Sequence, residues 1–285
     1  MDSGVRTDEE PPILSVTNSL PQVPVIDLQK FFSEEFKDLE LEQLQRACKE
    51  WGFFQLINHG VSTLLVEKVK LEIQEFFNLP MEEKNKFWQK PDDIEAFGQA
   101  FVVCEQQKLN WGDMFYMITL PTYLRKPHLF PKLPLSLREN FEAYSAELKN
   151  LAMKVLDLVA KALAMDPNDM QILKNGTWIP VKPLPNAFVI NIGDIMEIVS
   201  NGIYRSIEHR ATVNSVKERL SIATFYSPKL DGDMGPAPSL VTPQTPAVFR
   251  RIGVADYFNG YFSRELRGKA YVDVLRVQYE EINRN

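Results

Sequence analysis

The residues best suited to chemistry in this chain are its histidines, and there are only three: His59, His128 and His209. His209 lies in the sequence YRSIEHRATVN and is followed ten residues later by Arg219 and, two positions on, by Ser221. In an extended strand this spacing places Arg219 and Ser221 on one face. A guanidinium beside a hydroxyl can clamp a carboxylate, because the fork pairs both oxygens and the hydroxyl adds a third bond. The same spacing also fits an exposed polar strand face.

The other polar candidates have simpler interpretations. His59 follows an apolar run and precedes Gly60, so we expect it to cap a turn, and His128 lies in a proline-bounded loop where we expect it to be solvated. A run of carboxylates near an expected helix end is predicted to coat a solvated face: Glu82, Glu83, Asp92, Asp93 and Glu95. The sequence contains no GxSxG, GxxxxGK[ST], GxGxxG or HExxH motif, which argues against those nucleophile, phosphate and zinc sites.

The composition of the chain limits the classes of binding partner that we expect. The chain has 285 residues, 45% of them hydrophobic, and a net charge of −6, so we expect a packed core and neither nucleic acid nor a membrane as partner. Two cysteines without a CxxC pair argue against a disulfide framework. The acidic start MDSGVRTDEEPP lacks an apolar segment and predicts no signal peptide. These features predict a soluble cytoplasmic protein, and we expect it to be a monomer.

The first region is predicted to be mainly helical. Residues 1–22 are expected to form a flexible tail, and VPVIDL is expected to form an edge strand. Apolar residues at helical spacing predict a helix that ends at Gly52, followed by a buried strand in FFQLIN. Ser62 is a suitable N-cap for the next helix, and a capping box of Ser136 and Glu139 predicts the start of the longest helix, over residues 137–162.

After residue 170 the chain becomes rich in β-branched and aromatic residues. Asn201-Gly202 is a hairpin signal, and a short helix is expected near residues 266–275. An α+β fold is therefore predicted, with region 23–170 mainly helical and region 171–285 mainly β. The expected strands cover residues 178–183, 187–192, 195–199, 203–213 and 220–226.

Several long stretches of the sequence resemble the plant iron(II)/2-oxoglutarate-dependent dioxygenases, closest to the senescence-related-gene dioxygenases and the alkaloid O-demethylases. The stretches include ACKEWGFFQLINHGV, EIQEFFNLPMEEKNKFWQ, WIPVKPLPNAFVINIGDIMEIVSNGIYRSIEHRATVNSVKERLSIATF and GKAYVDVLR. The resemblance implies a helical region packed on a double-stranded β-helix, or jelly roll. It further implies iron(II) held by two histidines and a carboxylate, with 2-oxoglutarate as cosubstrate and ascorbate as supporting reductant. His209 matches the second iron-binding histidine, and Arg219 and Ser221 match the motif that binds 2-oxoglutarate.

One block of the family pattern is missing between Met170 and Gln171. Relatives carry there an NYYPPCP strand and an HxD strand, so we expect roughly seventy residues and several jelly-roll strands to be absent. With them go the first histidine, the aspartate and a cosubstrate-binding tyrosine, and no HxD or HxE occurs anywhere in the chain. Asp194 is interpreted as a turn residue between strands and not as a substitute carboxylate.

The resemblance predicts a member of this family that oxidises, hydroxylates or O-demethylates a small specialised metabolite. The missing ligands predict that its oxygenase activity is impaired, and no catalytic residue is assigned. Two alternatives remain open at this point. The chain could be a metal-independent binding protein or cyclase-type enzyme that reuses the pocket, or a non-functional splice or truncation product.

Overall fold

A three-stranded sheet joins the two regions of the chain. Strand β2 (Phe53–Ile57) is central, β1 (Val25–Asp27) pairs parallel to it, and β5 (Phe188–Asn191) pairs antiparallel on its other side. A strand from the second region therefore completes a sheet begun by the first, which confirms the expected edge strand and the expected buried strand. The computed structural model describes residues 22–90, 93–98, 112–163, 179–209, 216, 218–263 and 270–277.

The helices of the first region begin and end close to where the sequence predicts. Helix α1 (Lys37–Arg46) continues into a π-helical turn (Ala47–Trp51), which ends at Gly52 in the left-handed conformation, with φ of +62°. Helix α2 (Thr63–Phe77) is capped by Ser62, whose Oγ accepts a hydrogen bond from the Leu65 N–H at 3.3 Å.

The long helix α4 (Leu135–Leu163) begins two residues before Leu137, the first helical residue that a capping box at Ser136 would give. The Pro134 carbonyl accepts the first intrahelical bond, from the Arg138 N–H, so Ser136 already lies inside the helix. Proline suits this junction because it has no N–H to leave unpaired. The expected helix is confirmed, whereas the expected capping box is wrong.

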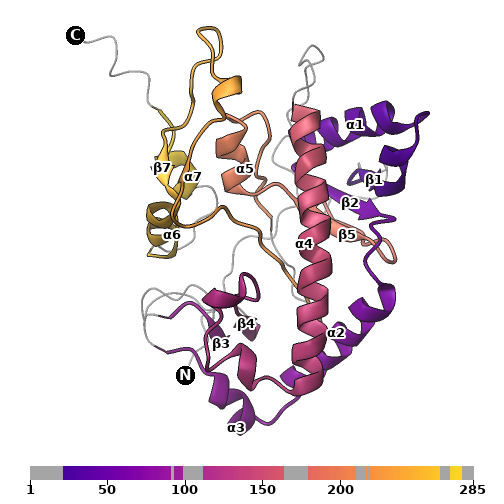
Figure 1. The fold of residues 1–285 in the computed structure, drawn as a ribbon, viewed down its shortest axis with the longest axis vertical. Helices are drawn as coiled ribbons and strands as arrows, with labels where there is room; N and C mark the ends of the chain where they lie inside the picture. Colours follow the sequence, from indigo (N-terminus) through magenta and orange to yellow (C-terminus); the bar gives the residue numbers. More distant parts are fainter. Residues whose placement is uncertain are drawn as a thin grey trace.

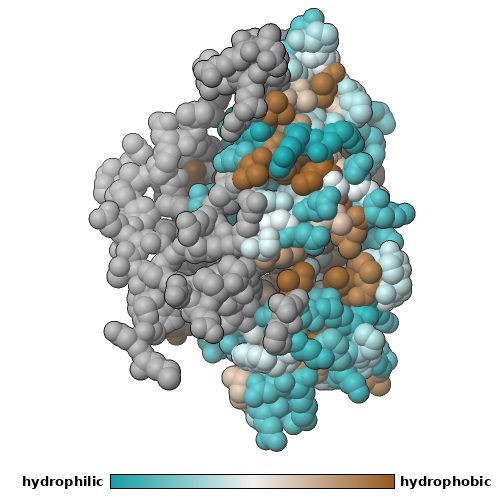
Figure 2. Space-filling view, turned by 90° about the vertical axis from the view of Figure 1, so that its left-hand side faces the viewer, coloured by the Kyte–Doolittle hydropathy of each residue, from teal (hydrophilic) through white to brown (hydrophobic). Residues whose placement is uncertain are grey.

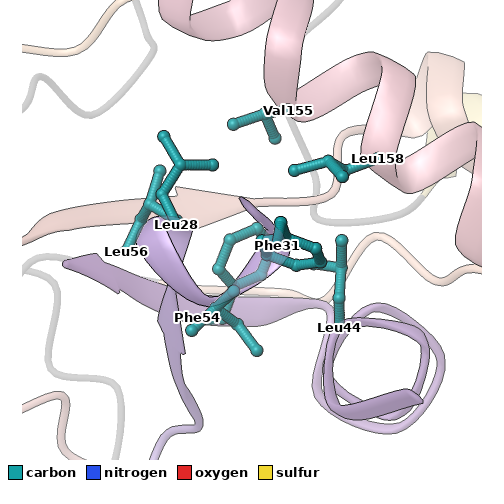
Figure 3. A pocket seen from close by; sticks show the side chains of 8 residues that line it. Leu28, Phe31, Leu44, Phe54, Leu56, Val155 and Leu158 are labelled. Carbon is teal, nitrogen blue, oxygen red and sulfur yellow. The ribbon is translucent and has the colours of Figure 1, made fainter. Parts of the chain in front are cut away.

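Helix α4 packs against the sheet and forms the centre of the main core. In Figure 1 it lies between the sheet, with α1 and α2, and the C-terminal elements. Side chains from β1, β2, α1 and α4 meet around a small apolar void (Figure 3). It is lined by Ile26, Leu28, Phe31, Leu44, Phe54, Leu56, Val155 and Leu158. The void offers about 10 Å³ and no polar lining atom, so it is a packing defect and not a ligand site.

The remaining elements are short. Around α5, α6 and α7 a second core forms, in which Ile198, Phe249, Val254 and Tyr257 are buried. The further helices and strands are α3 (Met81–Lys84), β3 (Ala96–Gly98), β4 (Met114–Tyr116), α5 (Asp194–Val199), β6 (Asp233–Met234), β7 (Ile252–Gly253), α6 (Val254–Phe262) and α7 (Ala270–Val274).

The strand expected over residues 195–199 is wrong, because this segment is helix α5. Ile195 and Ile198, three residues apart, both face the second core, and Met196 packs against the main core. A short apolar run does not distinguish strand from helix by periodicity. Asp194 is accordingly the first residue of a helix and not a turn between strands.

The described segments that should carry the candidate site form no paired strand. Residues 203–209 and 218–226 belong to no strand in the described part of the chain, so the expected strands there are not observed. Leu220 and Ile222 nevertheless pack against the main core, while Arg219 and Ser221 are exposed. The predicted alternation is thus present without a β-ladder.

The described residues form an α+β fold, as the sequence predicts. They include three small sheets and one long helix, α4. On the face drawn in Figure 2, hydrophobic side chains lie in small groups between hydrophilic ones. Within the described ranges, no helix is long and apolar enough to cross a membrane. The boundary expected at residue 170 and the expected tail, residues 1–22, fall almost entirely outside these ranges.

Candidate functional site

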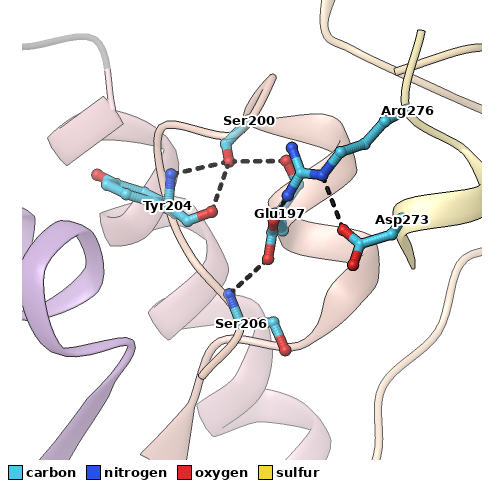
Figure 4. A network of polar contacts seen from close by, with 6 residues as sticks. All are labelled: Glu197, Ser200, Tyr204, Ser206, Asp273 and Arg276. Atoms are coloured by element: carbon cyan, nitrogen blue, oxygen red, sulfur yellow. Dashed lines mark hydrogen bonds and ion pairs between the residues drawn. The ribbon is translucent and has the colours of Figure 1, made fainter. Parts of the chain in front are cut away.

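The segment that leads to His209 is anchored by side chains of helix α5 and the turn after it. Ser200 Oγ accepts a hydrogen bond from the buried Tyr204 N–H at 3.1 Å and donates to a carbonyl, either that of Tyr204 at 3.4 Å or that of Glu197 at 3.2 Å. Glu197 Oε2 accepts from the Ser206 N–H at 2.9 Å. Figure 4 shows that these bonds tie the chain down three residues before His209.

Glu197 is itself a buried carboxylate, with 2% of its surface exposed. Its Oε1 pairs with Arg276 Nη2 at 2.7 Å, and Arg276 also binds Asp273 at 2.9 Å (Figure 4). The Arg276 guanidinium lies over the Phe249 ring, 4.8 Å from its centroid. A buried charge of this kind requires a partner. Glu197 in the apolar run IMEIVS therefore indicates a buried ion pair, which the sequence analysis did not predict.

His209 is exposed, and its imidazole is held in one orientation. Its Nδ1 lies 3.1 Å from the Ile207 carbonyl oxygen, and its ring meets the Phe53 ring edge to face at 5.1 Å. A carbonyl oxygen can only accept, so Nδ1 carries the proton and the lone pair of a neutral ring is on Nε2. This arrangement suits a metal ligand, whose second nitrogen usually donates to a carbonyl or carboxylate.

Arg219 and Ser221 are both exposed, whereas Leu220 and Ile222 between and beside them are partly buried. Among the described residues, no hydrogen bond or ion pair joins either of them to His209. The structure therefore brings Arg219 and Ser221 to one face and leaves their approach to His209 as an expectation.

The other two histidines cannot complete a metal site. His59 Nδ1 accepts from the Val61 N–H at 3.1 Å, and its Nε2 lies 3.0 Å from the Asn186 carbonyl, so both ring nitrogens are committed. The expected turn-capping role of His59 is confirmed. His128 is half-buried, and its buried Nε2 has no partner in the described part of the chain, so the expectation of a solvated ring is wrong.

Part of the carboxylate run is also buried and paired. Lys126 forms ion pairs with Asp93 and, at 3.4 Å, with Glu95, whose other oxygen accepts from the Ile118 N–H at 2.8 Å. Burial alone would raise the pKa of Asp93, but hydrogen bonds from Lys126 and from the Glu95 N–H lower it. This pair of acids therefore fixes a loop, and the expectation of a purely solvated face is wrong for Glu95, which is 3% exposed.

The described donors do not fit the iron site of the 2-His-1-carboxylate type. Across the described ranges no group of three His, Cys, Asp or Glu side chains is placed to hold a metal ion. All three histidines lie within these ranges, and only His209 has a ring nitrogen that is both exposed and uncommitted. One imidazole is two ligands short of the facial triad.

Comparison with known proteins identifies the family. Residues 23–133 match the model of the "non-haem dioxygenase in morphine synthesis N-terminal" domain, and residues 160–228 match the 2OG-Fe(II) oxygenase superfamily. The chain is 48% identical to oxoglutarate-dependent flavonoid 7-O-demethylase 1 of Ocimum basilicum over 91% of this chain and 83% of the relative. It is 47% identical to protein SRG1 of Arabidopsis thaliana, over 90% of this chain and 86% of the relative. It is 44% identical to codeine O-demethylase of Papaver somniferum, over 90% of this chain and 85% of the relative.

The fold agrees with this family. A solved structure of JOX2 in complex with 2OG, Fe and JA superposes with a TM-score of 0.81 at 28% identity, covering 92% of each chain. The chain belongs to the plant 2OG-Fe(II) dioxygenase family. Iron(II) and 2-oxoglutarate are the cofactors of that family, and its members act on small molecules.

Proposed function

We propose that this chain is a 2OG-Fe(II) dioxygenase family member that keeps a cosubstrate clamp but lacks a complete iron site. Arg219 and Ser221 form the clamp for the distal carboxylate of 2-oxoglutarate, and His209 is the one retained iron-binding histidine. The observation that carries the proposal is the donor inventory: three histidines, one of them free to bind, and no HxD or HxE in the sequence. Oxidative turnover is accordingly impaired.

The lengths of the alignments support the proposal that a block of residues is absent from this chain. The comparison with the flavonoid demethylase spans 308 positions and takes in 91% of a 285-residue chain. Since 91% of the chain is about 259 residues, about 49 positions have no counterpart here. This is shorter than the expected block of roughly seventy residues, and it is long enough for several strands. We place the loss between Met170 and Gln171, at the junction of regions 23–170 and 171–285.

The substrate class follows the relatives: it is a small specialised metabolite, as the names of the flavonoid and codeine demethylases suggest for those proteins. The protein acts as a monomer in the cytoplasm, without nucleic-acid or membrane partners.

The clamp is tested by calorimetric titration of the purified chain with 2-oxoglutarate. Arg219→Ala should weaken binding about tenfold or more, and Arg219→Lys should restore only part of it, because a lysine cannot pair both carboxylate oxygens. Ser221→Ala should weaken binding by a smaller factor. Arg250→Ala is the matched control, since Arg250 is also exposed and lies in the same region.

A succinate-release assay with iron(II), ascorbate and a flavonoid substrate tests the impairment. We expect succinate at the level of a protein-free control. Unchanged affinity in Arg219→Ala would contradict the clamp, and sustained succinate release that His209→Gln abolishes would contradict the impairment.

A further inference from the structure

The first region of the chain touches the His209 segment at one sharp corner, Gly52-Phe53. Gly52 ends the π-helical turn in the left-handed conformation, with φ of +62°. A methyl group at this position would collide with the Arg205 carbonyl oxygen and would lie 2.6 Å from Cγ1 of Ile207. Only glycine satisfies both the conformation and the close approach. The absence of a side chain at Gly52 therefore allows residues 205–207 to pack directly against this corner.

Phe53 follows at once and supplies the contact with the imidazole. It is the first residue of β2, and its backbone is fixed by pairing with Asn191 of β5. Its ring meets the His209 ring at 5.1 Å between centroids and 74° between planes. This is the edge-to-face geometry that aromatic rings prefer. Because Phe53 lies on a paired strand, its ring is a firm surface for the exposed imidazole.

The opposite side of the segment is fixed by α5. Ser200 holds Tyr204, and Glu197 holds the Ser206 N–H, so the backbone between them has little freedom. The Ile207 carbonyl is thereby placed to accept from His209 Nδ1 at 3.1 Å. The chain before His209 is held from both sides, and the ring plane is held by Phe53.

We propose that Phe53, placed by Gly52, is a positioning residue for His209. The ring contact holds the imidazole where the Ile207 carbonyl can accept from Nδ1, and this selects the tautomer with the proton on Nδ1 and the lone pair on Nε2. An edge-to-face contact is strong enough to favour one orientation of the His209 ring over the others by roughly three- to tenfold. The inference concerns the tautomer of the free ring and needs neither a bound metal nor a cosubstrate.

Nitrogen NMR of the histidine rings tests this inference directly. With only three histidines, long-range proton–nitrogen spectra of the full-length chain labelled with 15N-histidine contain three ring systems, and His209→Gln assigns one of them. At about pH 8 an ordinary imidazole is neutral. We expect His209 to show a protonated Nδ1 and a bare Nε2. His59, whose Nδ1 accepts from Val61, should show the opposite pattern and serves as an internal reference.

In Phe53→Leu, the chemical shifts of the two His209 ring nitrogens should move toward the averaged values of a ring that exchanges between tautomers. Phe53→Tyr should keep the wild-type chemical shifts. Phe141→Leu, at a partly buried phenylalanine of α4, is the matched control and should leave His209 unchanged. The inference is overturned if His209 keeps its protonated Nδ1 in Phe53→Leu, or if the wild-type ring carries its proton on Nε2. Neither result depends on 2-oxoglutarate, iron or turnover, so each is distinct from failure of the proposed function.

Discussion

His209 and Cys48 are two potential ligands in opposite environments, and the environment decides what each can do. His209 is exposed, whereas Cys48 is fully buried in the main core. Burial raises the pKa of the Cys48 thiol to about 12. Only a thiolate binds metal or attacks an electrophile well, so Cys48 is a core residue and contributes no ligand at neutral pH.

The raised pKa of Cys48 predicts a loss of stability in alkali. Above an ordinary thiol pKa of about 9.0 the unfolded chain releases the proton, while the folded chain keeps it up to about 12. The unfolded state then binds fewer protons, so the free energy of unfolding falls as pH rises through this window. Relative to Cys48→Ala, the wild-type chain should lose about 1.4 kcal/mol between about pH 8 and pH 10. Urea unfolding at both pH values measures this, and parallel losses in the two chains would contradict it.

At the scale of elements, the two long helices differ in how they begin. Ser62 accepts a hydrogen bond from a backbone N–H at the start of α2, whereas Ser136 lies inside α4 behind Pro134. Ser62→Ala should therefore lower the free energy of unfolding by about 1 kcal/mol. The matched variant Ser136→Ala should change it by less than about 0.5 kcal/mol. Equal effects in urea unfolding would mean that the capping box suggested by the sequence operates after all.

The pair of Glu197 and Arg276 ties α5 to the chain after α7. Arg276→Ala leaves the buried Glu197 carboxylate without this guanidinium, and should lower the free energy of unfolding by about 1–2 kcal/mol, since Arg276 is itself partly exposed. Arg276→Lys should lower it less. The exposed Arg250 provides the control variant Arg250→Ala, and indistinguishable unfolding midpoints for Arg276→Ala and Arg250→Ala would refute the role of the pair.

Local patterns predicted the elements whose signals are local. The Ser62 cap, the end of the helical turn at Gly52 and the alternation around Leu220 all depend on neighbours in sequence, and all are present in the structure. Helix α5 was taken for a strand, because its six residues are too few to show a period. The β-rich pattern after residue 170 was overestimated for a related reason. A strand needs a partner, and segments 203–209 and 218–226 pair with none in the described residues.

The candidate site was predictable as residue types but not as contacts. His209, Arg219 and Ser221 were identified from spacing and resemblance, and the structure shows the last two on one exposed side. The contact of Phe53 with His209 joins residues far apart in sequence, and no local pattern encodes it. The same holds for Glu197, whose bond to the Ser206 N–H became visible only in three dimensions.

At the scale of the whole molecule, the described residues of the first region hold most of the helices, and those of the second region hold the short strands β5, β6 and β7. The sheet of β1, β2 and β5 and helix α4 hold one core, and α5, α6 and α7 surround another. Family membership extends across both, from residue 23 to residue 228. Both regions therefore belong to the family, and the proposed difference from its relatives is the set of iron ligands.

The most direct test of that difference is the amount of iron that the purified chain retains. Anaerobic loading with iron(II) and 2-oxoglutarate, followed by desalting and metal analysis, gives the ratio of iron to protein. One imidazole predicts a ratio near zero, equal to that of His209→Gln. A ratio near one that falls in His209→Gln would contradict the account, because it would require two further ligands from this same chain.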